Sequence, residues 1–182
     1  MRTAATAFAA LLFFTLLTGV LYAGAVAGIA RFAFPKQANG SLVVRGGRVV
    51  GSELIAQNFK DPKHFWPRPS AAGFNPLPSG GSNYAPSSAA LLGKINERKK
   101  LGMTREMLFA SGSGLDPHIS PRAAHDQVER IAAARGLNEM EKNAVRVLIA
   151  VRTEGRQYGL LGEERVNVLL LNLALDEELR RE

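Results

Sequence analysis

Residues 3–30 read Thr-Ala-Ala-Thr-Ala-Phe-Ala-Ala-Leu-Leu-Phe-Phe-Thr-Leu-Leu-Thr-Gly-Val-Leu-Tyr-Ala-Gly-Ala-Val-Ala-Gly-Ile-Ala, without one charged side chain. An α-helix rises about 1.5 Å per residue, so about 20 apolar residues cross the hydrocarbon core of a bilayer. This stretch is longer than that, and no second such run follows in the 182 residues. The sequence therefore predicts one membrane-spanning helix followed by a more polar domain.

A cleaved secretory signal is the competing interpretation of this run. Such a signal has a charged start, an apolar core of about 7–15 residues and a small-x-small exit. Arg2 and the small residues at 23–27 fit the two ends. The apolar core is too long, however, because it continues from Ala4 past Tyr22, which favours an uncleaved anchor. Within it, Gly24 and Gly28 form a Gly-x-x-x-Gly pair that lets a second helix approach closely in lipid, so we expect a partner helix there.

We expect a short tail at residues 1–5, a transmembrane helix at 6–30 and one soluble domain at 31–182. Arg31 and Lys36 follow the span, whereas only Arg2 precedes it, and this count alone favours a cytoplasmic domain. Long domains cross membranes largely regardless of charge, so the count does not fix orientation. The absence of cysteine is compatible with an oxidising or a reducing compartment.

The chain is basic, with a formal net charge of +7. A basic balance suits nucleic acid, anionic lipid or an acidic partner. The positive residues are mostly dispersed, and the one run of three, Arg98-Lys99-Lys100, has no interleaved aromatic residues on which bases would stack. We therefore expect no nucleic-acid partner and interpret this cluster as a solvated helix end.

The part after the anchor predicts an α+β domain that begins with strands. Leu42-Val43-Val44 and Arg48-Val49-Val50 flank Arg45-Gly46-Gly47, which indicates a hairpin. Residues 64–88 are rich in Pro, Gly, Ser and Asn but carry four aromatic residues, which indicates a long irregular segment that is packed down.

Helices are predicted after this segment. Ser88 caps a helix that ends near Leu101, and Ser120-Pro121 starts another that ends at Gly136. In the latter we expect Ala124, Val128 and Ile131 to face inward and Asp126 to pair with Arg130.

Two further helical segments follow. Asn138 with Glu141 resembles a capping box for a helix that ends before Gly155. The residues that we expect on its inner face are Met140, Ala144, Val147, Leu148 and Val151. The segment 166–175 fits either a buried strand or a helix; Asn167 as a cap favours a helix.

Residues 111–121, Ser-Gly-Ser-Gly-Leu-Asp-Pro-His-Ile-Ser-Pro, concentrate hydroxyls, a carboxylate and an imidazole. Neither a phosphate-binding loop nor a Gly-x-Ser-x-Gly nucleophile elbow is present. A metal site needs more ligands than Asp116 and His118. We therefore predict a tight loop and no catalytic or metal-binding residue, with a hydrolase that uses Ser111 or Ser113 with His118 as the alternative.

Ser79-Gly80-Gly81-Ser82-Asn83 is a second glycine-rich stretch. Successive backbone N–H groups in such a run can hold an anion, although most short runs of this kind are turns. These five residues are the candidate nucleotide-binding residues of the chain.

Many ordered motifs together resemble the KdpC family, a subunit of Kdp-type, ATP-driven potassium transporters. They are Thr18-Gly-Val-Leu-Tyr22, Phe34-Pro35, Gln37-Ala-Asn-Gly-Ser-Leu42, Val50-Gly-Ser52 with Leu54-Ile55 and Gln57, Arg68-Pro-Ser-Ala71, Ser79 to Asn83, Ser111 to Pro121, Ala134-Arg-Gly136, and Arg165-Val-Asn-Val-Leu169 with Leu171-Asn-Leu-Ala-Leu175. The resemblance covers nearly the whole chain.

The resemblance implies a non-catalytic accessory subunit that stabilises the complex and raises the ATP affinity of its pump subunit. The implied partners are a potassium-channel-like subunit, a P-type ATPase subunit and a small single-span subunit, besides membrane lipid. It also implies a single-pass protein of the cytoplasmic membrane, with its N-terminus inside and its domain outside. ATP and potassium then act at partner subunits, unless Ser79 to Asn83 contact ATP directly. Our candidate partner-interface residues are Gly24, Gly28, Arg68, Ser111, Asp116 and His118.

Overall fold

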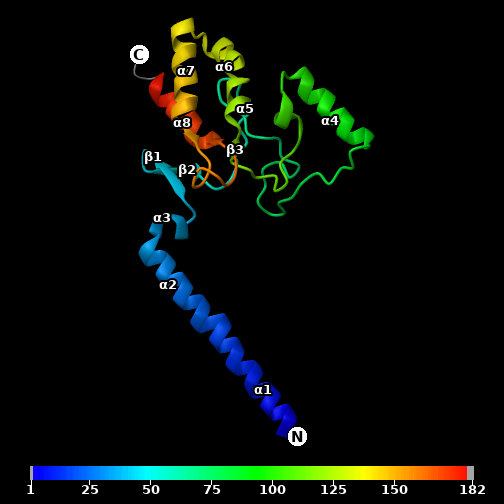
Figure 1. The fold of residues 1–182 in the computed structure, drawn as a ribbon, viewed down its shortest axis with the longest axis vertical. Coiled ribbons are helices and arrows are strands. Elements are labelled where there is room, and N and C mark those ends of the chain that lie inside the picture. Colours follow the sequence, from blue (N-terminus) through cyan, green and yellow to red (C-terminus); the bar gives the residue numbers. More distant parts are fainter. Residues whose placement is uncertain (1, 180–182) are drawn as a thin grey trace. The chain divides into compact units, whose positions relative to one another are not determined.

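The computed structural model describes residues 2–179, and Figure 1 shows its elements. The chain forms two compact units, Met1–Val50 and Gly51–Glu182. The first contains the apolar helix and the second contains the helices and the small sheet that make up the folded domain.

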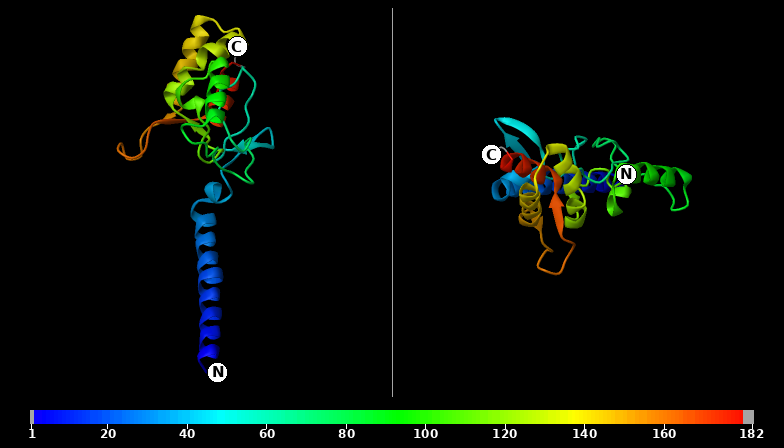
Figure 2. Two further views of the ribbon diagram at one scale, coloured as in Figure 1. Left: turned by 90° about the vertical axis from the view of Figure 1, so that its right-hand side faces the viewer. Right: turned by 90° about the horizontal axis from the view of Figure 1, so that it is seen from above.

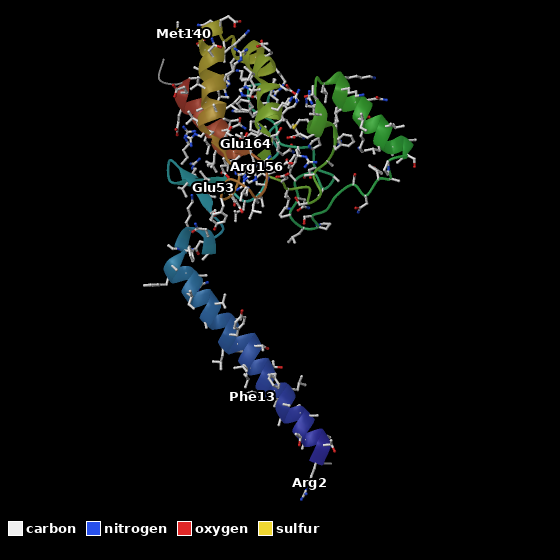
Figure 3. The ribbon with its side chains drawn as sticks, viewed as in Figure 1. Arg2, Phe13, Glu53, Met140, Arg156 and Glu164 are labelled. Atoms are coloured by element: carbon white, nitrogen blue, oxygen red, sulfur yellow. The ribbon has the colours of Figure 1, made fainter. Side chains whose placement is uncertain are left out.

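The apolar helix of the first unit runs from Arg2 to Ala33 and is long and apolar enough to cross a membrane. It consists of α1 (Arg2–Phe14), a π-helical stretch η1 (Thr15–Tyr22) and α2 (Ala23–Ala33). Its side chains, such as Phe13, extend outward from the helix (Figure 3) and none is buried. Within η1 the Thr18 hydroxyl donates to the Phe14 carbonyl at 2.7 Å, so this polar side chain is satisfied by its own helix.

The predicted hairpin is present after this helix and a short turn of helix, α3 (Pro35–Ala38). Strand β1 (Leu42–Arg45) pairs with β2 (Arg48–Ser52). Gly46 and Gly47 connect them with φ of 56° and 75°, a left-handed conformation that favours glycine.

The second unit is α+β, as predicted. Its elements are α4 (Ala89–Lys100), the 3-10 helix η2 (Arg105–Leu108), β3 (His118–Ile119), α5 (Pro121–His125), α6 (Val128–Arg135), α7 (Glu139–Val151), β4 (Thr153–Glu154), β5 (Arg165–Asn167) and α8 (Val168–Glu178). The three strands form an antiparallel sheet in the order β3-β5-β4. Helices α5 to α8 lie together, whereas α4 lies to one side of them (Figure 1).

The core lies between α5–α8 and the small sheet. Its largest fully buried side chains are Phe65, Ile119, Ile131, Ile149, Leu171 and Leu175. Burying a large apolar side chain stabilises a fold by about 1.5–3 kcal/mol, so this cluster accounts for the association of the helices. Phe65 belongs to the irregular segment, which is therefore packed down as its aromatic residues indicate.

The helix starts confirm three predictions from the sequence. Ser120 Oγ accepts from the Ala123 N–H, and Asn138 and Glu141 form both hydrogen bonds of the capping box. Asn167 Oδ1 accepts from the Leu170 N–H, so the segment that fitted strand or helix is a short strand followed by a helix.

Two predictions about these helices are wrong, although Ala124, Val128 and Ile131 are buried as predicted. In α7 the buried residues are Val145 and Ile149, with Leu148 partly buried. Met140 lies at the outer end of the helix (Figure 3) and is exposed, as are Ala144, Val147 and Val151. Helix α7 has apolar residues on more than one face, and the elements that pack against it decide which face is buried.

The second correction concerns residues 121–136, which form two helices, α5 and α6, instead of one. Asp126 does not pair with Arg130; its carboxylate accepts from the Thr104 hydroxyl. Arg130 donates to the carbonyls of Pro62 and His64 instead, at 2.6 and 3.0 Å. Hydrogen bonds to residues distant in sequence therefore replace the ion pair that the helical spacing of Asp126 and Arg130 predicted.

The connection between β4 and β5 projects away from the helices of its unit in both views of Figure 2, where it is orange. It is held as a hairpin by the bridge between Gln157 and Leu161. Its tip carries the exposed apolar side chains of Tyr158 and Leu160, whose exposed fractions are 93% and 81%.

Candidate partner-binding site

Residues 64–88 and 111–121 pack against each other. The Ser111 N–H donates to the Pro69 carbonyl at 3.0 Å. A Cβ at Gly114, whose φ is 72°, would lie 2.8 Å from the Gly80 carbonyl oxygen, and one at Gly81 would lie 3.1 Å from the Gly112 carbonyl oxygen. Glycine is required at 114 by both the backbone conformation and the close approach. The two segments thus form one continuous structure.

Arg68 connects these segments through its guanidinium. Its Nη2 donates to the Ala110 carbonyl at 3.4 Å, and its Nη1 lies 3.6 Å from Asp116 Oδ2. The side chains are 28% and 34% exposed, so solvent weakens this long ion pair. Arg68 Nε is buried and has no hydrogen-bond partner among residues 2–179. The guanidinium therefore retains donor capacity that the domain itself does not use.

Asp116 also holds the turn that leads into β3. Its Oδ1 accepts from the His118 N–H at 3.1 Å and lies 3.9 Å from His118 Nδ1. Burial, and after it the positive charge of Arg165, lowers the pKa of His118, against the opposing charges of Glu154 and Asp116. Both effects favour the neutral form of the imidazole.

Arg68, Asp116 and His118 line a polar groove of about 270 Å³. The side chains that line it come from the loop segments, from η2 and from the end of the projecting hairpin that leads into β5: Arg68, Glu106, Asp116, His118, Glu163, Glu164 and Arg165. Glu106 is fixed by the Ser120 N–H, which donates to its Oε1 at 2.8 Å. The groove thus combines fixed charges of both signs with partial exposure.

The structure brings together three of the predicted interface residues and separates the rest. Arg68, Asp116 and His118 line the polar groove. Ser111 lies behind them, with 2% of its surface exposed and no hydrogen-bond partner for its Oγ among residues 2–179. Gly24 and Gly28 are in α2 of the other unit, four residues apart on one face, and a Cβ at either would meet nothing within 4 Å.

The predicted nucleotide-binding residues lie next to this site. Gly81 and Ser82 line a separate cavity, together with Lys94 and Arg98 of α4. Asn83 has φ of 52°, so the run bends sharply there. Lys94 was not predicted to lie near this loop, because only the fold brings α4 back onto it.

Sequence reasoning also missed the polar residues that fasten the irregular segment to the helices. Asn172 on α8 accepts from the Phe65 N–H at 2.7 Å and donates to the Phe65 carbonyl at 2.9 Å. Gln127 makes the same pair of bonds with Trp66, at 2.8 and 3.2 Å. A signal was available for Asn172, since an amide inside the apolar run 168–175 must find buried partners.

No group of three His, Asp or Glu side chains able to hold a metal ion is found within the described part of the chain.

The model of the K+-transporting ATPase c chain family, KdpC, matches residues 4–177. The chain belongs to the KdpC family.

Curated KdpC proteins are similar over almost their full length. The potassium-transporting ATPase KdpC subunit of Geobacter sulfurreducens is 52% identical over 178 residues, which cover 91% of this chain and 93% of that protein. The KdpC subunit of Geobacter metallireducens is 49% identical over 177 residues, covering 91% and 92%. That of Polaromonas naphthalenivorans is 52% identical over 183 residues, covering 92% of each. The similarity therefore includes both the apolar helix and the candidate site.

Proposed function

We propose that this protein is the non-catalytic accessory subunit of an ATP-driven potassium uptake complex. In this role it stabilises the assembled complex and raises the affinity of the P-type ATPase subunit for ATP. The relatives are named as subunits of a potassium-transporting ATPase, which supports membership of such a complex. The other proposed partners are a potassium-channel-like subunit and a small single-span subunit.

The single observation that carries the accessory role is the packed pair of segments 64–88 and 111–121. They present Arg68, Asp116 and His118 along one groove while holding the backbone fixed at Gly80 and Gly114. A surface that is already ordered loses less conformational entropy on binding, which favours association with a protein partner. We propose that this groove faces the channel-like subunit.

A hydrolase that uses Ser111 or Ser113 with His118 is the alternative. An activated serine needs a base within hydrogen-bond reach. Ser111 Oγ is buried without a partner among the described residues, and Ser113 Oγ accepts from the Leu115 N–H at 3.1 Å. Neither hydroxyl bonds to His118, which favours the accessory role. Hydrolysis of a generic ester by the purified protein, abolished in His118→Ala, would favour the alternative.

Direct contact with ATP through Ser79 to Asn83 is a finer proposal. It is compatible with the open backbone at Gly80, where a Cβ would meet nothing within 4 Å. If the loop contacts ATP, ATP should protect the purified protein from proteolysis in a saturable way. Loss of this protection in Gly80→Val would support the contact. Protection that is unchanged in this variant would show that any ATP binding lies elsewhere.

We further propose that the protein is a single-pass component of the cytoplasmic membrane. Residues 1–5 form the inner tail, residues 6–30 span the bilayer, and residues 31–182 lie outside. The helix Arg2–Ala33 supports the span by its length and composition. Labelling of a cysteine introduced at exposed Lys63 by a membrane-impermeant reagent in intact cells would test this orientation, and a cysteine at Thr3 is the matched inner control.

An affinity pull-down tests the accessory role. Tagged full-length protein is recovered in mild detergent from native membranes of potassium-starved cells, and the co-purifying proteins are identified by mass spectrometry. We expect a P-type ATPase and a channel-like protein in fixed ratio, with less of both for Arg68→Gln and Asp116→Asn.

The matched control is Asp126→Asn, which changes a carboxylate that lies outside the polar groove. Recovery of the wild-type protein alone, from a preparation that keeps other membrane complexes intact, would contradict the accessory role. Equal recovery for all variants would contradict the assignment of the groove.

A further inference from the structure

A second cavity lies between the glycine-rich run and α4, outside the polar groove. It measures about 320 Å³, at the lower end of the size of small-ligand pockets, which is about 300–1,000 Å³. The residues that line it are Ser70, Ala71, Gly81, Ser82, Tyr84, Lys94, Arg98 and Ala110. Most of these are polar, so the cavity suits a polar ligand.

Two cations and no carboxylate line this cavity. Lys94 and Arg98 are four residues apart on α4, so their side chains share one face of the helix. Lys94 has no hydrogen-bond or ion-pair partner among residues 2–179. Arg98 donates one bond from Nη1 to the Leu108 carbonyl at 2.6 Å, which holds its guanidinium in place.

Arg98 is partly removed from water without a carboxylate to balance it in the cavity. Burial lowers its pKa, and the carboxylate that opposes this is that of Glu97, the next residue, which does not line the cavity. A partly buried cation of this kind is stabilised by an anion that enters its own cavity.

Neutral donors complete the lining. The hydroxyls of Ser82 and Tyr84 make no hydrogen bond among the described residues, and neither do the backbone N–H groups of Gly81 and Ser82. Ser70 Oγ accepts from the N–H groups of Ala72 and Phe74, so its own hydrogen is available to a ligand. Gly81 lies close to the Gly112 backbone, where a Cβ would be 3.1 Å from the Gly112 carbonyl oxygen.

We infer that this cavity binds a phosphate-type oxyanion, carried by a small solute or by a lipid headgroup. A phosphate monoester carries about −1.5 to −2 charges near pH 7 and three acceptor oxygens. That charge balances Lys94 and Arg98 together, whereas a carboxylate balances only one of them. The volume leaves room for the organic group that carries the phosphate. This inference does not rest on the proposed accessory role.

Calorimetric titration of the full-length protein in mild detergent tests it, with inorganic phosphate as the probe. We expect saturable binding that weakens about tenfold in Lys94→Gln, the effect of one charge-assisted hydrogen bond, and further in Lys94→Glu. The matched control is Lys99→Glu, which makes the same charge change on the same helix but outside the cavity. We expect less than about a twofold effect there, since an exposed charge at a distance is screened. Ser82→Ala is a second, smaller change within the cavity.

The source of the phosphate is distinguished by a second titration. Water-soluble short-chain phosphatidic acid, whose headgroup is a phosphate monoester, is compared with phosphatidylcholine of the same chain length, whose phosphate is a diester. Binding of phosphatidic acid that depends on Lys94, without binding of free phosphate, would assign the cavity to a lipid headgroup. Lys94-dependent binding of free phosphate would assign it to a solute.

Three outcomes would overturn the inference. The first is no saturable binding of either probe up to about 10 mM, which is weaker than a specific site of this charge warrants. The second is an equal loss in Lys94→Glu and Lys99→Glu, which would show diffuse attraction to a basic surface. The third is Lys94-dependent binding of acidic peptides but not of phosphate, which would make the cavity a protein-binding site.

Discussion

The guanidinium carbon of Arg130 lies 3.8 Å from the centre of the Trp66 indole ring. The same side chain donates hydrogen bonds to the carbonyls of Pro62 and His64, and to Gln127 Oε1 at 2.6 Å. One residue of α6 thus fixes the backbone that leads into the irregular segment. Arg130 is important for the position of the candidate site even though it does not line the polar groove.

Arg130→Lys should lower the free energy of unfolding by about 1–3 kcal/mol, because an ammonium cannot stack on the indole and donate to several carbonyls at once. Thermal unfolding of the full-length protein in mild detergent measures this. Arg122→Lys on α5, which is exposed, is the matched control and should have almost no effect. Equal stability of the two variants would show that the stacking contributes nothing.

Asn172→Leu should lower the free energy of unfolding by about 2–4 kcal/mol, since it leaves the buried N–H and carbonyl groups of Phe65 without partners. Hydrogen exchange should also become faster around residues 61–70, which local unfolding of this segment would expose. The exposed Asn96→Leu on α4 is the control. Unchanged exchange at 61–70 would mean that Gln127 and Arg130 hold the segment without Asn172.

His118 makes stability depend on pH in a defined direction. Its pKa in the folded protein lies below the ordinary value of 6.5, chiefly because of burial and then because of Arg165. The unfolded chain therefore binds the proton more readily, so stability is full above about pH 6.5 and falls as the pH drops through the folded pKa. Charges that face His118 from neighbouring elements include Asp116, Glu154 and Arg165.

Removing the imidazole should remove this part of the pH dependence. We expect the fall in melting temperature between pH 7.5 and pH 5 to be smaller in His118→Gln than in the wild-type protein. The exposed His125→Gln should retain the full fall. A larger fall in His118→Gln would contradict the direction of the shift.

Gly24→Leu or Gly28→Leu should release the protein from its complex in mild detergent. Both positions are open on one face of α2, where close helix packing in lipid requires small residues. The measurement is the amount of P-type ATPase recovered with the tagged protein. Gly19→Leu, on the same apolar helix but not on this face, is the matched control; equal recovery for all three variants would place the docking face elsewhere.

Local signals predicted much of the fold. The apolar run predicted the helix Arg2–Ala33, and Asn138 with Glu141 predicted the start of α7. These features depend on residues within four positions of one another, so the sequence alone is sufficient to find them. The order of the sheet, β3-β5-β4, depends on pairing between strands that lie far apart in the chain, and the sequence did not predict it.

The parts that sequence reasoning missed depend on distant contacts. Asp126 has Arg130 at helical spacing, yet it meets Thr104, because the loop at 61–66 offers Arg130 more acceptors. In the same way, Lys94 belongs to the second cavity only because α4 returns to the glycine-rich run. Arg68, Asp116 and His118 were expected at a partner interface, but the contact between segments 64–88 and 111–121 was not predicted.

The close approach of Gly114 to the Gly80 carbonyl oxygen has an evolutionary consequence. A side chain at 114 requires the backbone at 80 to move, and that movement would reshape both the polar groove and the second cavity. Changes in either segment are thus constrained by the other, so variation that alters one surface should be accompanied by a compensating change across the contact. The two segments, although separated by α4 and η2 in the chain, should vary as a single unit.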